Sequence, residues 1–371
     1  MLQWYQRKQW RITAMQFRQN PVGTGPFYFK LWVANEKLVL RKNQTYFEKD
    51  KKGEPLPHLE AVAITFVPDK QSAFLEFVKG NLDLISGIDA SYKDELLTYN
   101  GELQPKYRDR FKLYRQPYLN TEYLGILMDT SGSNMKNSPL LDVRIRQAIN
   151  YGFDRKKMMR YLRNNIGTPA RAGMIPLGLA AYDTSRIPGY SYQPELARAL
   201  LAEAGYPRGR GLPPITLQTN SSYLDLCEYI QGELAVIGLD LEVEVTPPST
   251  LRQAMATSKV AFFRGSWIAD YPDAENYLSL FYSENWTPNG PNYTHFKNAQ
   301  FDTWYEKAAA ETNDSLRLRL YQKMDSLVMD QAPVVPLYYD QVLRFYPKSI
   351  KGLAGNALNM LDLKRVRKHG G

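Results

Sequence analysis

The sequence predicts an α/β protein that is organised in two lobes. The chain has 371 residues, and because single domains commonly hold about 100–200 residues, this length favours two of them. Hydrophobic residues make up 44% of the chain and charged residues 23%, a balance that is typical of folded proteins. The third observation is a strand–helix–strand pattern in the middle of the chain, which predicts a parallel sheet.

The first part of the chain predicts strands arranged around one helix. Two glycines and two prolines in PVGTGPF, Pro21–Phe27, indicate a tight and specific backbone path. Strand-like runs follow at 27–33, 37–43 and 61–67. A helix is then predicted over 71–80, with Gly80 as its stop. A short strand is predicted to return at 82–88.

From Tyr123 onward, longer helices and strands alternate. The segment 124–129 predicts a strand, and Pro194 stands at a favoured first position of a helix. The best-defined unit runs through a strand, a helix, a strand, a short helix and a strand at 215–219, 223–238, 239–245, 251–257 and 260–267. This order predicts parallel strands joined by right-handed crossovers. Helices at 301–314 and 315–331 and a buried strand at 333–339 are predicted after this unit.

Composition and charge argue against several classes of function. The net charge is +9, but the basic residues are spread along the chain apart from the tail at 364–368, so we expect no nucleic-acid partner. Cys227 is the single cysteine and is predicted to be a buried hydrophobe. The chain has no run of about 18 apolar residues that would predict a membrane span. Its first residues, MLQWYQRKQW, lack the pattern of an export signal.

The sequence offers no motif for catalysis or for a cofactor. Its three histidines, His58, His295 and His369, are far apart and lack the spacing of metal ligands. We find no P-loop, no GxGxxG and no GxSxG elbow, and no arrangement singles out a nucleophile with its base. We therefore expect a protein that is not an enzyme and that holds neither a metal nor a cofactor.

One segment, residues 264–273, has the composition of a ligand clamp. Arg264 lies near the end of a predicted strand, and Trp267, Asp270 and Tyr271 follow it before a proline-containing loop. Ligands of open α/β sheets bind beyond the carboxyl ends of strands. Asp270 would accept hydrogen bonds from an ammonium group and Arg264 would pair with a carboxylate, which together suit a peptide. The alternative is structural: Asp270 caps the next turn and Arg264 pairs with a neighbouring acid.

The chain resembles the family-5 extracellular solute-binding proteins, which serve oligopeptide, dipeptide and nickel importers. The resemblance begins with PVGTGPFYFKLWVANEKLVLRKNQTYF at 21–47. It continues in order through the segments VPDKQSAFLEFVKGNLDLI, SPLLDVRIRQAINYGFDRKKM, PELARALLAEAGYP and RLRLYQKMDSLVMDQAPVVPLYY. It covers roughly Gln19 to Ile350, and the number of ordered matches makes it specific.

This resemblance implies a two-lobed periplasmic-binding-protein type II fold. Two strands would cross between the lobes, near Tyr118–Tyr123 and near Pro336–Asp340. Residues 1–122 would form part of lobe I, 123–335 would form lobe II, and 336–371 would return to lobe I. Because the family has a long stretch before the PVGTGPF motif, we expect the first lobe to be incomplete in this chain.

The resemblance also carries the candidate site. In peptide-binding members an Asp in a W-x-x-D stretch holds the α-ammonium group of the peptide, and Asp270 matches it; an Arg before it matches Arg264. Trp267 and Tyr271 complete our set of predicted ligand contacts. Pro247 and Pro248 stand in a region where the family often has a Trp, a departure that bears on ligand identity.

We therefore predict the binding component of an ABC importer, which captures peptides or similar zwitterions by hinge closure and docks on a membrane permease. It would be a monomer in the periplasm or at the cell surface, where a lipid anchor is an option. The rival ligands are nickel chelates, heme and oligosaccharides, and a hydrolase is the remaining alternative.

Overall fold

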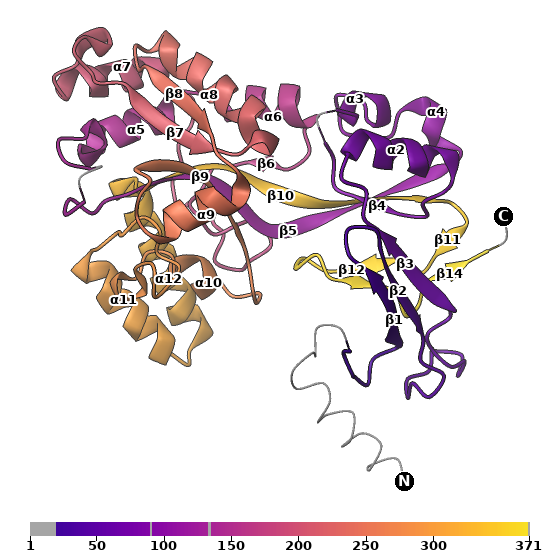
Figure 1. Ribbon diagram of the computed structural model, residues 1–371. Helices are drawn as coiled ribbons and strands as arrows, with labels where there is room; N and C mark the ends of the chain where they lie inside the picture. Colours follow the sequence, from indigo (N-terminus) through magenta and orange to yellow (C-terminus); the bar gives the residue numbers. More distant parts are fainter. Residues whose placement is uncertain (1–19, 90, 133–134, 370–371) are drawn as a thin grey trace.

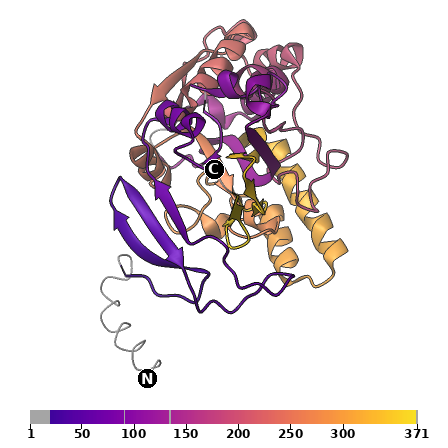
Figure 2. The same cartoon turned by 90° about the vertical axis from the view of Figure 1, so that its right-hand side faces the viewer.

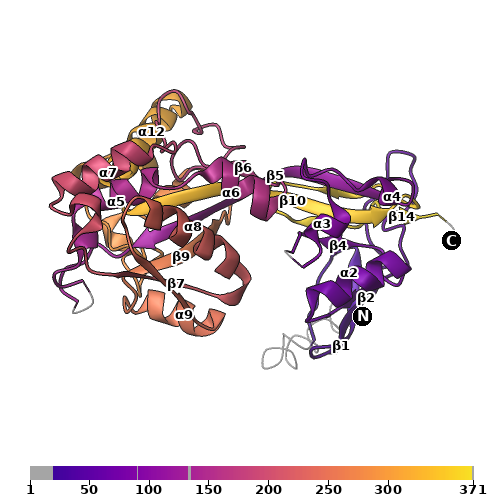
Figure 3. The same cartoon turned by 90° about the horizontal axis from the view of Figure 1, so that it is seen from above.

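Two lobes lie at the two ends of a long antiparallel ribbon in the computed structural model, which describes residues 20–89, 91–132 and 135–369. The ribbon is made of β5 (Phe111–Ile126) and β10 (Val334–Pro347). Figures 1 and 3 show the smaller lobe, with β1–β4 and α2–α4, at one end of this ribbon and the larger lobe, with α5–α12 and β6–β9, at the other.

The smaller lobe is built from short elements. They are β1 (Phe27–Val33), β2 (Lys37–Lys42), β3 (Ala61–Thr65), α2 (Lys70–Lys79), β4 (Ile85–Ser86), α3 (Lys93–Leu96) and α4 (Pro105–Arg108). The predicted strands and the predicted helix of this region are therefore confirmed, although the strand expected at 82–88 is reduced to two residues. Gly80 ends α2 with a positive φ of 91°, a conformation that favours glycine.

The larger lobe holds most of the regular structure. Its elements are α5 (Val143–Tyr151), α6 (Arg155–Arg163), β6 (Thr168–Pro169), α7 (Pro194–Glu203), β7 (Ile215–Thr219), α8 (Leu224–Val236), β8 (Leu241–Val245), α9 (Pro248–Ala256), β9 (Phe262–Ile268), α10 (Glu275–Leu278), α11 (Ala299–Ala310) and α12 (Asp314–Gln331). After the ribbon, four two-residue strands follow beside the smaller lobe (Figure 1), which are β11 (Ile350–Lys351), β12 (Ala354–Gly355), β13 (Leu361–Asp362) and β14 (Arg367–Lys368).

Among the described residues, no helix combines the length and the apolar character needed to cross a membrane.

The main sheet joins both lobes through the ribbon. Its strand order is β4–β10–β5–β9–β7–β8, and β6 pairs with β10 off this path. β7 is parallel to both β8 and β9, which confirms the parallel unit predicted over 215–267. Because β7 and β9 are parallel neighbours, the loops that follow them meet at the same edge of the sheet.

The ribbon is irregular at its middle. Between the pairs Tyr339–Thr121 and Gln341–Pro117, β10 advances by two residues while β5 advances by four, so β5 bulges opposite Asp340. Pro117 has no backbone N–H to give to the ladder. A bulge of this kind interrupts pairing and bends the strand. The bulge therefore interrupts the pairing of the ribbon between the two lobes.

Each lobe has its own hydrophobic core. In the larger lobe, Figure 1 shows helices on both faces of the sheet, and one core packs under α5–α8 while a second packs under α9–α12. In the smaller lobe, Phe74 and Phe77 of α2 pack with Phe111 and Phe345 from the ribbon. Fully burying an aromatic or aliphatic side chain of this size stabilises the fold by about 1.5–3 kcal/mol, so both ends of the ribbon are held by substantial packing.

The sheet β1–β2–β3 is set apart from the main sheet. Figure 2 looks onto the smaller lobe and shows this sheet along its outer side. Large apolar side chains on it, including Tyr28, Leu31 and Ile64, are 49%, 43% and 42% exposed. Its strands nevertheless pair in antiparallel fashion, with one register shift between Phe29 and Leu31 of β1, so backbone pairing rather than a covered face defines them.

Gly173, in the long loop between β6 and α7, and Gly232 are expected to respond in opposite directions to substitution by alanine. A Cβ on Gly173 would lie 2.1 Å from Asp325 Oδ1, and that carboxylate is fixed by the N–H groups of Met174 and Ile175 at 2.7 and 3.3 Å. Burial raises the pKa of Asp325 to about 6. We expect Gly173→Ala to lower the free energy of unfolding by about 2 kcal/mol, because overpacking a buried site forces a shift.

The matched control is Gly232 in the middle of α8. A Cβ there meets no atom within 4 Å, so Gly232→Ala is expected to raise the free energy of unfolding by up to about 1 kcal/mol, the helix-propensity difference. Denaturant unfolding of both variants measures the two changes. Equal changes in the two variants would contradict the packing described around Gly173.

Candidate functional site

Of the four residues predicted as ligand contacts, Trp267, Asp270 and Tyr271 lie at the carboxyl end of β9 and in the loop that follows it, whereas Arg264 lies near the start of the strand. Arg264 is buried inside the strand, and Trp267 near its end is half-buried. Asp270 and Tyr271 are exposed in the loop. The predicted position at a strand end is confirmed for Trp267 and the residues after it, but it is wrong for Arg264, because β9 begins only two residues before it.

Arg264 is held by groups inside the protein. Its guanidinium forms an ion pair with the buried Glu122 of β5 and stacks on Tyr223, 3.1 Å from the ring centroid. Burial lowers the pKa of Arg264 to about 10. This geometry is the structural alternative weighed for Arg264, although its Nε has no hydrogen-bond partner among the described residues. A guanidinium carries five N–H donors, so the pair with Glu122 does not use all of them.

Asn276 brings Trp267 and Asp270 together. Its Oδ1 accepts a hydrogen bond from the Trp267 indole N–H at 2.9 Å and from the Asp270 backbone N–H at 3.2 Å. The turn that follows is capped by Asp273, which accepts from the backbone N–H of Glu275 at 2.8 Å. Asp270 is therefore not the capping residue, and within the described part of the chain its carboxylate receives no hydrogen bond.

Glu275 fixes the rest of the loop. Tyr271 and Tyr305 both donate their hydroxyl groups to its carboxylate. Burial, together with this bond, raises the pKa of Tyr271. The hydrogen bond from the Tyr271 hydroxyl to Glu275 thus fixes the position of the Tyr271 ring next to Asp270 in the loop.

The loop is attached directly to the bulge of the ribbon. The Ala269 N–H donates to the carbonyl of Leu119 at 2.9 Å, and the Leu119 N–H donates to Ala357 at 2.8 Å. Leu119 belongs to the bulged stretch of β5. Asp270 therefore follows a residue that is hydrogen-bonded to the ribbon where the two lobes join.

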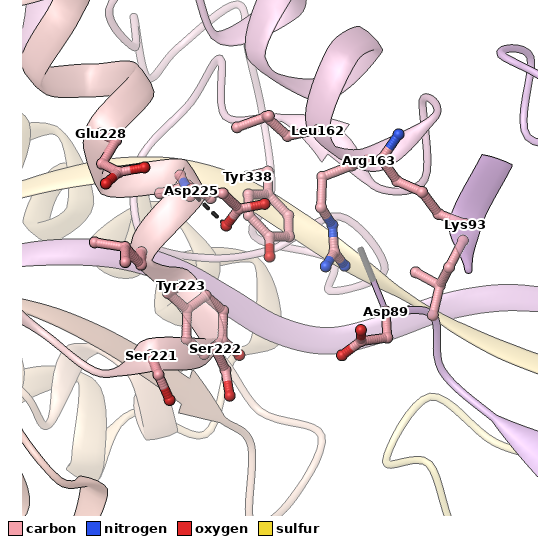
Figure 4. Close-up of a pocket in the computed structure, with 13 residues that line it drawn as sticks. Asp89, Lys93, Leu162, Arg163, Ser221, Ser222, Tyr223, Asp225, Glu228 and Tyr338 are labelled. Atoms are coloured by element: carbon pink, nitrogen blue, oxygen red, sulfur yellow. Dashed lines mark hydrogen bonds between the residues drawn. The ribbon is translucent and has the colours of Figure 1, made fainter. Parts of the chain in front are cut away.

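A cavity of about 360 Å³ lies beside the ribbon and is lined by both lobes. Its walls are Ile88, Asp89, Lys93, Leu162, Arg163, Ser221, Ser222, Tyr223, Leu224, Asp225, Leu226, Glu228 and Tyr338. Figure 4 shows side chains from α3, α6, α8 and β10 converging on it, with the Arg163 guanidinium between Tyr338 and Asp89. This volume falls in the range of ligand pockets, about 300–1,000 Å³.

This cavity lies outside the site predicted from the sequence. None of its lining residues was among the four predicted contacts; Arg264 reaches it only through the ring of Tyr223. A sequence signal that could have indicated it is the position of Ser221–Tyr223, directly after β7 and before α8. Loops at the carboxyl ends of β7 and β9 share one sheet edge, so the cavity and the Asp270 loop belong to the same edge.

The two basic residues of the cavity already have acidic partners. Lys93 Nζ lies 2.7 Å from the Asp94 carboxylate and donates to Asn164 at 3.0 Å. Arg163 pairs with Asp340, at the bulge of β10, at 3.2 Å. The remaining charged groups on the wall are carboxylates, so the charge that is left to interact with a ligand is negative.

Two other clusters unite residues that are distant in sequence. Asp50, Glu54 and His58 come within 4.8 Å of one another, but Arg367 lies among them, 3.2 Å from Asp50 and 3.0 Å from His58 Nε2. A guanidinium thus stands where a metal ion would bind. This cluster links the C-terminal segment to the smaller lobe.

In the second cluster, a serine, a histidine and an aspartate contact one another in the same arrangement as in a catalytic triad. Ser258 Oγ lies 3.0 Å from His295 Nε2, and His295 Nδ1 lies 3.3 Å from Asp129. Nε2 also lies 3.1 Å from the hydroxyl of Thr287 and 3.2 Å from its carbonyl oxygen. The cluster lies before the start of β9, at the end opposite to Asp270, and it connects three loops.

Comparisons with known proteins agree with this architecture. A model of the bacterial extracellular solute-binding proteins, family 5 (middle region), matches residues 3–289. Heme-binding protein A of Haemophilus influenzae is 28% identical over 321 residues, which are 85% of this chain and 54% of that protein. The glutathione-binding protein GsiB of Salmonella typhimurium is 26% identical over 357 residues, 93% of this chain and 65% of that protein. The chain thus spans between half and two thirds of the length of these relatives.

Solved structures show the same fold. The periplasmic binding protein DppA of Helicobacter pylori, in complex with the peptide STSA, has a TM-score of 0.79 at 24% identity, over 99% of this chain and 67% of that one. The substrate-binding protein CtaP of Listeria monocytogenes has a TM-score of 0.79 at 21% identity, over 96% of this chain and 69% of that one. The predicted fold class, two-lobed α/β of periplasmic-binding-protein type II, is confirmed.

Proposed function

The chain belongs to family 5 of the bacterial extracellular solute-binding proteins, and we propose that it captures peptides or similar zwitterionic solutes for an ABC importer. The observation that carries this proposal is the cavity that both lobes line beside the ribbon. A ligand that contacts both lobes favours the orientation in which they are close, and closure is then a shift of population.

The ribbon supplies the hinge in this proposal. We assign residues 1–122 and 336–371 to one lobe and 123–335 to the other, so that the change of lobe falls near the bulge opposite Asp340. Closure changes backbone angles at a few residues. Because strand pairing is already interrupted at the bulge, we expect such a change there to break few ladder hydrogen bonds. The closed form would dock on a membrane permease, in the periplasm or at the cell surface.

Asp270 and Arg264 are the proposed anchors for the two ends of a peptide. Asp270 is exposed at the carboxyl end of β9, and its carboxylate suits an α-ammonium group. Arg264 would share its donors between Glu122 and a ligand carboxylate. Trp267 and Tyr271 would supply flat contacts beside Asp270, and both are held in place by hydrogen bonds.

A thermal-shift screen with pooled di- to pentapeptides tests this function. A ligand at 100 times its Kd stabilises the folded state by about 2.7 kcal/mol, so we expect Tm to rise by several degrees with peptide pools. Heme, nickel chelates and oligosaccharides belong in the same screen, because one relative is named for heme binding. A folded chain that responds to one of these and to no peptide would overturn the peptide assignment.

The hydrolase alternative has one observation in its favour, the Ser258–His295–Asp129 cluster. We assign it a structural role, because Thr287 shares Nε2 of the histidine and the cluster lies away from the cavity. The relatives are solute-binding proteins rather than enzymes. Turnover of peptide or ester substrates that is lost in His295→Gln would establish the hydrolase instead.

A further inference from the structure

We propose that the cavity between the lobes selects ligands that carry a basic side chain, whose ammonium or guanidinium group lies against Asp225 and Glu228. This inference rests on the proposed function and names the class of peptide that the site prefers. It concerns the cavity wall rather than Asp270, which serves the main-chain terminus.

The basic residues that line the cavity are already paired with acidic residues. Lys93 and Arg163 are the basic residues among those that line the cavity, and each is already paired with an acid, Asp94 and Asp340. Neither partner is among the lining residues. Both positive charges of the wall are therefore paired within the protein, although Arg163 Nε has no hydrogen-bond partner among the described residues.

The acids of the wall retain acceptor capacity. Asp89 Oδ1 accepts from the N–H and hydroxyl of Ser91, and Asp225 Oδ1 accepts from the Leu226 N–H at 2.8 Å, which leaves the second oxygen of each. In the described part of the chain the Glu228 carboxylate receives no hydrogen bond. A carboxylate offers about four lone-pair positions, so these groups match the several donors of an ammonium or guanidinium.

Asp225 and Glu228 act from one face of α8. They are three residues apart in this helix, so their side chains are neighbours on its surface. Asp225 lies in the first turn, where its negative charge offsets the positive end of the helix, which would otherwise favour an anion. Two carboxylates at this spacing form a local negative potential in a chain whose net charge is +9.

The apolar part of the wall fits the stem of a long basic side chain. Leu162, Leu226 and Ile88 line the cavity together with the ring of Tyr223. Lys and Arg side chains bury their methylene stems on apolar surface while the charged head reaches polar groups. The apolar side chains of the wall therefore suit the methylene stem of a Lys or Arg side chain, and the carboxylate oxygens that accept no hydrogen bond suit its charged head.

Isothermal titration of the chain with four tripeptides tests this inference. Ala-Arg-Ala, Ala-Lys-Ala, Ala-Gln-Ala and Ala-Glu-Ala differ only in the central side chain. We expect the two basic peptides to bind about fivefold more tightly than the Gln peptide, the scale of a partly exposed ion pair. We expect the Glu peptide to bind more weakly still, and the preference to shrink as salt is raised.

Variants locate the preference at the wall. Asp225→Asn combined with Glu228→Gln should reduce the difference in affinity between the Arg and Gln peptides to less than about twofold. Glu242→Gln, on the exposed side of β8, makes the same type of charge change away from the cavity and should retain the preference. Tm of each variant confirms that it is folded.

The outcomes separate this inference from the function on which it rests. Equal affinity for all four peptides, or a preference that survives the double variant, overturns the basic-side-chain inference and leaves peptide capture standing. No binding of any of the four peptides, or of the peptide pools, overturns both.

Discussion

Glu122→Ala is expected to lower the free energy of unfolding by about 3–5 kcal/mol, because it leaves the buried guanidinium of Arg264 without its charged partner. Glu122 is 2% exposed and Arg264 is 9% exposed, and they form an ion pair across β5 and β9. Water cannot replace a lost partner at this depth. Denaturant unfolding with circular dichroism measures the loss.

The second half of this test removes both charges. Breaking a buried pair is costly, but replacing both members by apolar residues of similar volume is often neutral, so Glu122→Met combined with Arg264→Met should recover most of the stability. Glu242→Ala, an exposed acid, should change the free energy of unfolding by less than about 0.5 kcal/mol. A Glu122→Ala variant as stable as this control would contradict the ion pair.

The double variant Glu122→Met, Arg264→Met also tests whether Arg264 binds the ligand. If Arg264 shares its donors with a ligand carboxylate, the apolar double variant will fold and bind peptides weakly. If Arg264 serves only Glu122, that variant will fold and bind peptides normally. Stability and affinity therefore report separately on the two roles.

Pattern reasoning was accurate where apolar periodicity and backbone signals agree. The strand β8, the helix α8 between two strands, and Gly80 after α2 all stand where the sequence predicted them. These features depend on residues near one another in the chain. Local spacing alone determines which face of a helix or strand turns inward.

The strand predicted for the first half of the ribbon is much shorter than the observed strand β5. The strand predicted at 124–129 is only the end of β5, which begins at Phe111. Asn120, Thr121 and Glu122 are buried polar residues, and Pro117 lies inside the strand. Polar residues and a proline lower the strand signal of a sequence, and their partners on β9 and β10 become visible only in three dimensions.

The candidate site shows the same limit. The loop around Asp270 was found because a strand end and a Trp–Asp pattern lie together in sequence. The partner of Arg264 is 142 residues away along the chain, and the cavity collects residues from segments as distant as Asp89 and Tyr338. Contacts of this kind follow from strand order, which no single segment encodes.

Asp270→Asn is expected to weaken binding of a peptide with a free N-terminus by about 10- to 100-fold, because a hydrogen bond to a charged group contributes about 1.5–3 kcal/mol. The substitution keeps the size of the side chain. The Asp270 backbone N–H, which donates to Asn276 at 3.2 Å, is unaffected, so the loop should keep its shape. Titration calorimetry with one peptide compares the two proteins.

An N-acetylated copy of that peptide makes the test specific for the ammonium group. The parent chain should discriminate strongly against the acetylated peptide, whereas Asp270→Asn should bind both forms with similar affinity, since the charge that distinguishes them has lost its partner. Asp240→Asn, an exposed acid before β8, should behave as the parent. If Asp270→Asn binds the free peptide as tightly as the parent does, the α-ammonium group has another partner, and the carboxylates of the cavity wall become the first candidates for it.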